Sequence, residues 1–433
     1  MGTVDCASHS AQSRGLSRQQ LKTLVLSALG GALEFYDFVV FVFFATTMGA
    51  LFFPADLPAW MRQVQTFGIF AAGYLARPLG GVLMAHFGDL TGRKRMFLLS
   101  ILLMALPTLL MGLLPTYAQI GIAAPLLLLV LRILQGAAIG GEAPGAWVFV
   151  SEHVSPRHRN LACGSLSLGL LAGILLGSLV ARALNAWLDE AQLLAWGWRL
   201  PFLLGGVFGL LAMVLRRQLQ ETPVFAELQA RRRLASELPL KAVLRDHASA
   251  VALGMLLTWL LTAAVVVTIL MMPTILQGMG VSRDAALAGN ALAVLAAMAA
   301  NLVAGALADR FGTGRVLALW SLLLGVAFWW CYRAAQDGHY SHALYALAGS
   351  GVGLTAMIPA IILGGFPPAV RFSGLSLAYN LAYAIAGGLT PVLLSLAMQR
   401  NPAAPAHYIA GMAALGIALA VGVAWRDQRM PAA

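Results

Sequence analysis

The chain has 433 residues, of which 60% are hydrophobic and only 10% are charged, and its mean hydropathy is +0.81. A soluble protein carries about a quarter charged residues, so this composition excludes a soluble protein and predicts an all-α membrane protein; the alternating pattern of an outer-membrane barrel is absent. The formal net charge of +11 does not indicate nucleic-acid binding, because the basic residues gather in one set of loops.

The N-terminal segment, residues 1–20, is polar and lacks the apolar core of a cleavable signal peptide. We expect it to be a cytoplasmic tail. The three cysteines, Cys6, Cys163 and Cys331, have neither metal-ligand spacing nor the pattern of a disulfide framework. The sequence therefore predicts no metal site and no cofactor.

The first apolar run contains an unexpected pair of acids, in the stretch "GGALEFYDF" from Gly30 to Phe38. Glu34 and Asp37 are three residues apart, so they share one face of a helix. A charge in the hydrocarbon layer costs at least a few kcal/mol. These acids therefore predict a site that faces the protein interior or a water-filled path.

Further apolar runs, separated by charged residues or Pro/Gly breaks, predict twelve transmembrane helices. Their centres lie near Phe38, Tyr74, Met104, Gly136, Leu171, Gly206, Leu261, Leu295, Leu323, Leu354, Ala386 and Leu415.

The loops divide these helices into two bundles of six. The predicted parts are the tail 1–20, an N-terminal bundle 21–216, a charged central loop 217–247, a C-terminal bundle 248–425 and a tail 426–433. Most of the 28 Lys and Arg residues fall in loops that would share one side with both termini. Because cytoplasmic loops are rich in Lys and Arg, both termini are expected to be cytoplasmic.

The fourth helix adds two ionisable residues, Arg132 and Glu142, to Glu34 and Asp37. At 1.5 Å of rise per residue, all four lie within ~9 Å of the bilayer centre. Arg132 would neutralise Asp37, which lies nearest in depth. Glu34 or Glu142 would then take up a proton, because burial disfavours a carboxylate without a partner. The sequence thus predicts a proton-coupling group; the alternative is an ion pair that only locks helices one and four together.

An internal repeat follows the second helix of each bundle, as "GDLTGRKR" (Gly88 to Arg95) and "ADRFGTGR" (Ala308 to Arg315). An acid at a helix end, a glycine turn and a cation could form charge-assisted bonds to a neighbouring helix. We expect a cytoplasmic gate; the alternative is simple anchoring by cations. Its predicted residues are Asp89, Gly92, Arg93, Arg95, Asp309, Arg310 and Arg315.

The chain from about Leu29 to Trp425 resembles the metabolite:proton symporter family of the major facilitator superfamily. Six segments carry the resemblance: "GALEFYDF", "ARPLGG", "RILQGAAIGGEAPGA", "WGWRLPF", "ETPVF" and "FPPAVRFSGLSLAYNLAYAIAGGLTP". The resemblance implies the major facilitator fold, with a substrate site between the two bundles. Members of this family carry citrate, oxoglutarate, shikimate, proline or betaines. The chain departs from the family pattern at Gly31, Ala85, Leu90, Thr313 and Gly314, and at Gly364 and Gly365, where the family often carries a glutamate.

We therefore expect a secondary transporter that takes up a small organic acid, such as a di- or tricarboxylate, together with protons by alternating access. One alternative is proton-coupled uptake of a zwitterionic osmolyte such as proline or a betaine, and a second is a membrane sensor that does not transport. Motifs of membrane enzymes are absent from the sequence. The candidate substrate-binding residues are Tyr36, Arg132, Tyr379, Asn380 and Tyr383.

The expected partners are a small-molecule substrate, protons and the lipid bilayer, with no nucleic acid. We expect a monomer in the inner (cytoplasmic) membrane.

Overall fold

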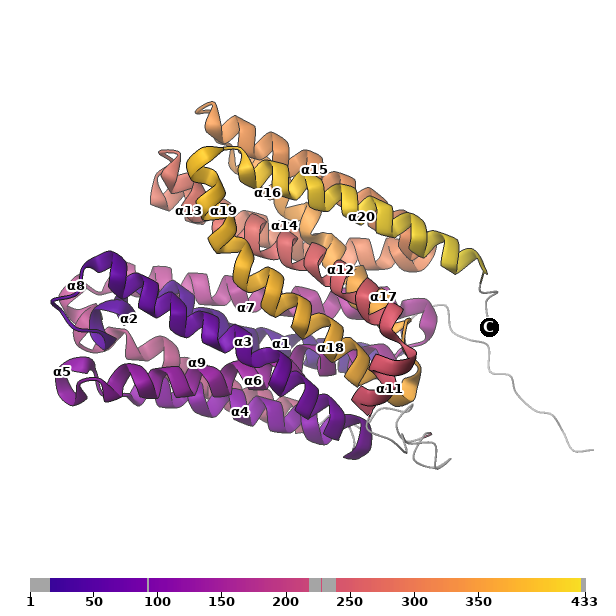
Figure 1. The fold of residues 1–433 in the computed structure, drawn as a ribbon, viewed down its shortest axis with the longest axis horizontal. Helices are drawn as coiled ribbons and strands as arrows, with labels where there is room; N and C mark the ends of the chain where they lie inside the picture. Colours follow the sequence, from indigo (N-terminus) through magenta and orange to yellow (C-terminus); the bar gives the residue numbers. More distant parts are fainter. Residues whose placement is uncertain (1–15, 92, 218–226, 228–238, 430–433) are drawn as a thin grey trace, which may run out of the picture.

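The computed structural model describes residues 16–91, 93–217, 227 and 239–429, and within these ranges it contains helices and no strands. The two halves of the chain lie side by side (Figure 1). The N-terminal half consists of α1 (Arg18–Phe43), α2 (Ala45–Phe52), α3 (Ala59–Thr91), α4 (Arg93–Leu113), α5 (Tyr117–Ile120), α6 (Ala123–Glu152), η1 (Pro156–His158), α7 (Arg159–Trp187), α8 (Glu190–Gln192), η2 (Leu193–Gly197) and α9 (Arg199–Arg217).

The C-terminal half begins after a short helix, α11 (Pro239–Asp246), which lies within the segment predicted as the central loop. The remaining elements are α12 (Ala248–Val265), η3 (Val266–Met271), α13 (Met272–Gly278), α14 (Arg283–Phe311), α15 (Thr313–Gln336), α16 (His342–Ser350), η4 (Gly351–Ala356), α17 (Met357–Leu363), η5 (Pro368–Val370), α18 (Arg371–Ala382), η6 (Tyr383–Gly387), α19 (Gly388–Arg400) and α20 (Ala404–Arg429).

The prediction of twelve spans is confirmed. Among the described residues, 10 helices are long and apolar enough to cross a membrane, and a pair bent by 44°, Glu190–Gly197 with Arg199–Val214, supplies one more. The shorter apolar helix Leu98–Leu113 completes the set. Each predicted centre lies in its own span.

Local sequence explains how the first span begins. Ser17 and Gln20 form a capping box: the Gln20 N–H donates to Ser17 Oγ at 3.2 Å, and the Ser17 N–H donates to Gln20 Oε1 at 2.9 Å. These bonds satisfy backbone groups that a helix start leaves open. The Gln20 side chain then donates to the carbonyl of His153 at 3.2 Å, which places the start of α1 beside the end of α6.

Close helix packing inside the N-terminal half depends on glycine. A Cβ on Gly136 of α6 would lie 1.9 Å from the carbonyl oxygen of Gly73 on α3, and one on Gly80 would lie 2.0 Å from that of Ala137. Small residues let helices approach closely in lipid, where van der Waals contact drives association. The α3 and α6 helices are therefore closely packed, and they carry Arg77 and Arg132, which are described below.

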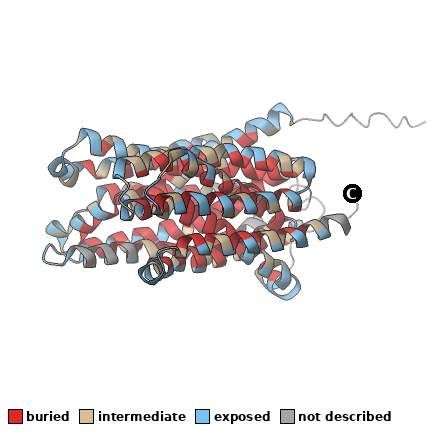
Figure 2. Cartoon of the chain, turned by 90° about the horizontal axis from the view of Figure 1, so that it is seen from above, coloured by how far each residue is buried: buried red, intermediate tan, exposed pale blue. Residues whose placement is uncertain are grey.

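The buried residues lie between the helices (Figure 2). Many exposed positions carry large apolar side chains. Leu75, Leu79 and Leu83 of α3 are all more than half exposed, as expected for a surface that faces lipid. An apolar hollow between α15 and α20 belongs to the same surface, since its lining residues Val326 and Trp330 are also more than half exposed.

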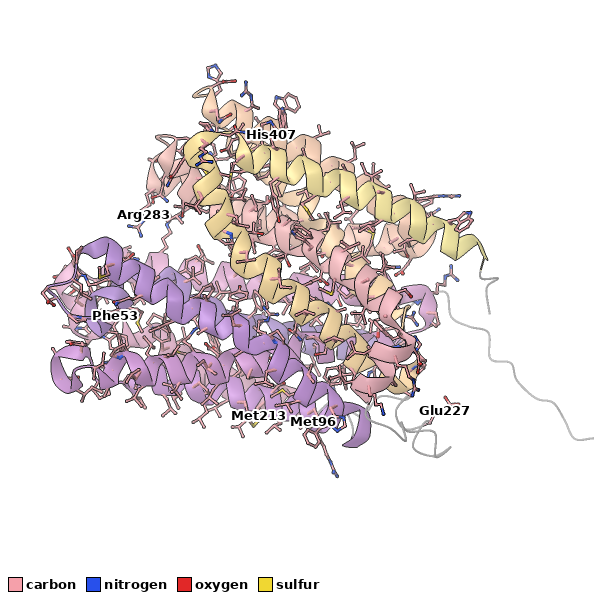
Figure 3. All side chains as sticks on the ribbon, viewed as in Figure 1. Phe53, Met96, Met213, Glu227, Arg283 and His407 are labelled. Atoms are coloured by element: carbon pink, nitrogen blue, oxygen red, sulfur yellow. The ribbon has the colours of Figure 1, made fainter. Side chains whose placement is uncertain are left out.

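The labelled residues identify the two ends of the molecule. Phe53 and Arg283, on either side of the interface between the halves, lie toward one end, and Met96 and Glu227 lie toward the other (Figure 3). The second end also holds α11 and the end of α20 (Figure 1). We call it the inner end, because the sequence predicts it to be cytoplasmic.

Candidate transport site

Arg132 of α6 is fully buried inside the N-terminal half. Its guanidinium carbon lies over the rings of Phe38 at 4.9 Å, Phe41 at 4.5 Å and Phe70 at 5.2 Å. Its Nη1 donates to the Phe38 carbonyl at 3.5 Å and to Gln135 Oε1. Aromatic faces and one amide therefore surround this cation.

Asp37 is fully buried too, but it does not pair with Arg132 in the described structure, so the expected ion pair is wrong. Its carboxyl group points toward α9: Cβ atoms on Gly205 and Gly209 would lie 2.5 Å from Oδ1 and 3.5 Å from Oδ2. Neither oxygen has a hydrogen-bond partner among the described residues. The sequence placed Asp37 and Arg132 within ~6 Å of each other in depth, but their side chains point to different neighbours.

Gln135 connects these two residues, and sequence reasoning missed it. Its Nε2 donates to the backbone carbonyl of Asp37 at 3.0 Å and to Thr108 Oγ1 at 2.8 Å, while its Oε1 accepts from Arg132. An amide one helical turn after an arginine, inside an apolar run, was the available signal.

The remaining predicted proton-coupling residues are Glu142 and Glu34. Glu142 is buried in α6. The Glu34 side chain lies outside the described part of the structure.

Tyr36, a predicted substrate contact, lies within the N-terminal half. Its hydroxyl donates to the Pro201 carbonyl at 3.0 Å, and its ring meets that of Phe208 edge-on at 5.1 Å. These contacts fix α1 against α9. Tyr36 therefore packs the bundle and does not face the C-terminal half.

A second buried arginine, Arg77 of α3, lies at the interface between the halves. Its guanidinium carbon lies 4.3 Å from the ring centre of Tyr383 and 5.5 Å from those of Tyr74 and Tyr379. Tyr74 and Tyr383 stack on each other at 5.8 Å across the two halves. Trp147 of α6 meets the Tyr379 ring edge-on at 5.1 Å. We call Tyr74, Tyr379 and Tyr383 the tyrosine cage.

The structure thus brings the predicted Tyr379 and Tyr383 to one place, together with Arg77, which the sequence offered only as an alternative anchor for an organic acid. The sequence did not single out Tyr74 and Trp147 for the substrate. Asn380 lies beside them, but its Nδ2 donates to the Gly140 carbonyl of α6 at 2.6 Å and to the Ser376 carbonyl at 2.9 Å. A Cβ on Gly81 would lie only 2.3 Å from the same nitrogen. Asn380 therefore joins α18 to α6 and α3.

At the inner end, a carboxylate of one half accepts several hydrogen bonds from the other half. The Asp309 carboxylate of α14 accepts from the N–H of Asn160 at 3.0 Å, from Asn160 Nδ2 at 2.9 Å and from the N–H of Leu161 at 2.9 Å. These N–H groups belong to the first turn of α7, where a helix has unsatisfied donors and a partial positive charge. Gly312 follows with φ of +96°, a conformation that favours glycine.

A buried ion pair reinforces the same end. Arg371 Nη1, at the start of α18, lies 3.1 Å from Glu152 Oε1, at the end of α6. Sequence reasoning counted Arg371 only among the basic loop residues and did not single out Glu152.

The other predicted gate residues are less informative. Arg95, Arg310 and Arg315 are exposed. Gly92 lies outside the described residues, and so do the side chains of Asp89 and Arg93. Among the described residues, Asp309 is the predicted gate residue that bonds to the opposite half.

The fold and this interface can now be compared with known proteins. The family description "Major Facilitator Superfamily" matches residues 29–391. The chain belongs to the major facilitator superfamily. It is a multi-pass secondary transporter rather than an enzyme.

Curated relatives cover most of the chain. The proline/betaine transporter of Escherichia coli (strain K12) is 32% identical over 414 residues, which are 92% of this chain and 82% of that protein. The glycine betaine/proline/ectoine/pipecolic acid transporter OusA of Dickeya dadantii is 33% identical over 411 residues, 92% of this chain and 81% of that one. A putative proline/betaine transporter of Staphylococcus aureus (strain COL) is 30% identical over 408 residues, 92% and 87% of the two chains.

Solved structures of the superfamily share the fold. The proton:xylose symporter XylE bound to 6-bromo-6-deoxy-D-glucose has a TM-score of 0.75 at 16% identity, and the match covers 95% of this chain and 96% of that one. At this identity the likeness shows the fold alone.

Proposed function

We propose that this transporter takes up a zwitterionic osmolyte of the proline or betaine class together with protons. The observation that carries the proposal is the agreement between its relatives and its interface. Each of the three curated relatives described above is named for proline and betaine. The interface places a buried guanidinium, which suits a carboxylate, among tyrosine faces, which suit a cation.

The sequence had favoured a small organic acid, and the comparisons support the zwitterionic alternative better. The physical reason is that a buried arginine serves both substrate classes, so Arg77 and Arg132 could not separate them. The residues around Arg77 are aromatic. A zwitterion needs an aromatic or acidic partner for its positive group, and the rings around Arg77 supply one.

We assign the coupled proton to the buried carboxyl groups of the N-terminal half. Asp37 is the first candidate, because both of its oxygens are buried, neither has a hydrogen-bond partner in the part of the chain that the structure describes, and a charge there is costly. Gln135 links the Asp37 backbone to Arg132, so a change in the charge of Asp37 can shift the neighbouring aromatic cluster. Glu142 and Glu34 are the other candidates.

The inner-end bonds serve in this proposal as the cytoplasmic gate. The hydrogen bonds of Asp309 to the start of α7 and the Glu152–Arg371 pair hold the halves together in this proposal, and both must break before the site opens inward. Alternating access then consists of rocking one half against the other. A monomer in the inner membrane with cytoplasmic termini completes the proposal.

The test is uptake into proteoliposomes with an imposed pH gradient. Radiolabelled glycine betaine and proline are compared with citrate, oxoglutarate and shikimate. We expect accumulation of a zwitterion that a protonophore abolishes. Accumulation of a dicarboxylate or tricarboxylate without a zwitterion would overturn the proposed substrate class, and binding without accumulation would support the sensor alternative.

A further inference from the structure

One edge of the Arg77 guanidinium lacks hydrogen-bond partners among the described residues. Arg77 is only 1% exposed, yet its Nε and Nη2 have no hydrogen-bond partner among the described residues. These two nitrogens lie on one side of the planar group, where a carboxylate can accept two parallel hydrogen bonds. A buried guanidinium nitrogen without a partner costs free energy, so this edge is suited to receive an anionic group.

The face of the same guanidinium is occupied by the tyrosine cage. Its carbon lies 4.3 Å from the Tyr383 ring centre, within the range of a cation–π contact. Cages of this kind are also the usual binding sites for quaternary ammonium groups. Arg77 therefore occupies the position that would suit the positive group of a zwitterion.

The cage also depends on how the two halves meet. Tyr74 belongs to α3 of the N-terminal half, and Tyr379 and Tyr383 belong to α18 and η6 of the C-terminal half. Tyr383 begins a π-helical turn, a local irregularity that is frequent at functional sites. A Cβ on Gly387 would lie 3.0 Å from the Tyr383 ring, so glycine at this position leaves room for the ring.

From these contacts we propose that Arg77 acts as an internal cation that fills the tyrosine cage, and that a zwitterion exchanges with it. The substrate carboxylate binds the Nε–Nη2 edge and draws the guanidinium away from the rings. The substrate ammonium group then takes its place against Tyr74, Tyr379 and Tyr383. A cation without a carboxylate cannot displace Arg77, and an acid without a cation cannot fill the cage.

This inference rests on the proposed function, because it names the subsite for the same zwitterionic substrate. It explains selection by one exchange: Arg77 repels a simple cation, and only a ligand that also neutralises Arg77 gains access to the rings.

The first experiment uses the wild-type protein, so it does not depend on the folding of a variant. Competition against radiolabelled glycine betaine is measured for choline, for the methyl ester of glycine betaine and for 3,3-dimethylbutanoate, which has a tert-butyl group in place of the trimethylammonium group. We expect each to bind at least tenfold more weakly than glycine betaine. Equal competition by choline and the ester would overturn the role of Arg77, and equal competition by dimethylbutanoate would overturn the role of the cage.

The second experiment tests the direction of the exchange with Arg77→Gln, Arg77→Lys and Tyr383→Leu. In Arg77→Gln we expect at least tenfold weaker binding of glycine betaine, because the guanidinium that binds its carboxylate is absent. We expect at least tenfold stronger binding of choline, because no internal cation then fills the tyrosine cage. Arg77→Lys weakens the binding of glycine betaine and still excludes choline, because lysine keeps the positive charge but lacks the two-nitrogen edge. Tyr383→Leu weakens the binding of glycine betaine and does not strengthen the binding of choline, because it removes one ring of the cage and keeps Arg77.

A merely structural Arg77 would lower the binding of every ligand together, and that result would overturn the proposal. If the wild-type protein binds neither glycine betaine nor proline, the proposed function fails and this inference fails with it. If the wild-type protein transports a zwitterion and Arg77→Gln changes neither affinity, only the inference fails.

Discussion

The Asp309 carboxylate of α14 accepts hydrogen bonds from the backbone N–H groups of Asn160 and Leu161, which open α7 in the other half of the molecule. Both oxygens are used, at 3.0 Å and 2.9 Å. The charge lies at the positive end of a helix, where a carboxylate is stabilised by the helix dipole as well as by the bonds. This single side chain therefore opposes separation of the halves at the inner end.

The first prediction concerns the variant Asp309→Asn. A neutral amide keeps one acceptor and loses the charge-assisted bonds, each of which contributes about 1.5–3 kcal/mol. The inner end should open more often. The native Cys163 reports it, since it is fully buried in α7 next to Gly164, whose Cβ would lie 2.6 Å from the Asn301 carbonyl of α14. In a Cys6→Ser, Cys331→Ser background, maleimide labelling of Cys163 should become several-fold faster.

The matched control is Asp284→Asn, which removes a carboxylate from the first turn at the opposite end of α14. Its labelling rate should equal that of the background protein. Equal labelling of Cys163 in Asp309→Asn and in the control would show that Asp309 does not hold the halves together.

The second prediction is energetic coupling between Glu152 and Arg371. Their atoms are 3.1 Å apart and their side chains are only 1% and 12% exposed. Removal of one partner leaves a buried charge, so each single variant, Glu152→Gln and Arg371→Gln, should be strongly destabilised, and the double variant should lose less than the sum. Thermal unfolding in detergent should give a coupling free energy of about 1–3 kcal/mol.

The exposed pair Arg245–Asp246 provides the comparison. Its atoms are also close, at 2.9 Å, but its side chains are 57% and 47% exposed. Solvent screens such a pair, so a double-mutant cycle of Arg245 and Asp246 should show little or no coupling free energy. Equal coupling in both cycles would contradict a special role for the buried pair.

The sequence predicted the fold well because its strongest signals are local. Span number follows from apolar length, and the glycine turn at Gly312 follows from its repeat. The site was harder, since depth along a helix does not give rotation about its axis. Asp37 and Arg132 lie at similar depths in the membrane, but the Asp37 side chain faces α9. The Arg132 side chain faces the rings of Phe38, Phe41 and Phe70.

Long-range partners were beyond sequence reasoning for a related reason. Tyr74 is one more aromatic residue in an apolar span, and only the contact between halves shows that it stacks on Tyr383. Glu152 likewise reads as a boundary residue until Arg371 is placed beside it. Pairs of this kind depend on how two bundles dock, which a single sequence does not specify.

The third prediction concerns the α3–α6 contact. In Gly136→Ala the new Cβ would lie 1.9 Å from the Gly73 carbonyl oxygen and 2.7 Å from the Gly73 Cα. Backbone atoms cannot move aside alone, so the helices must separate, at a cost of about 1–3 kcal/mol. The unfolding temperature in detergent should fall. In Gly411→Ala, where nothing lies within 4 Å of the new Cβ, it should stay the same or rise slightly, and a similar fall in both variants would contradict the packing argument.

The last prediction separates proton coupling from substrate binding. Asp37→Asn keeps the shape of the carboxyl group and removes its ability to gain or lose a proton. Substrate exchange across proteoliposomes that contain equal substrate on both sides should persist, because Arg77 and the tyrosine cage are untouched. Accumulation driven by a pH gradient should be lost.

The comparison is with Glu142→Gln, which removes another buried carboxyl group of the described structure, and with Glu34→Gln. If Asp37 carries the proton, these two variants keep at least part of the driven accumulation. If Asp37→Asn accumulates substrate normally and one of the glutamine variants does not, the proton is carried by that glutamate. The unpartnered burial of Asp37 would then serve only to pack α1 against α9, where Gly205 and Gly209 leave room for its side chain.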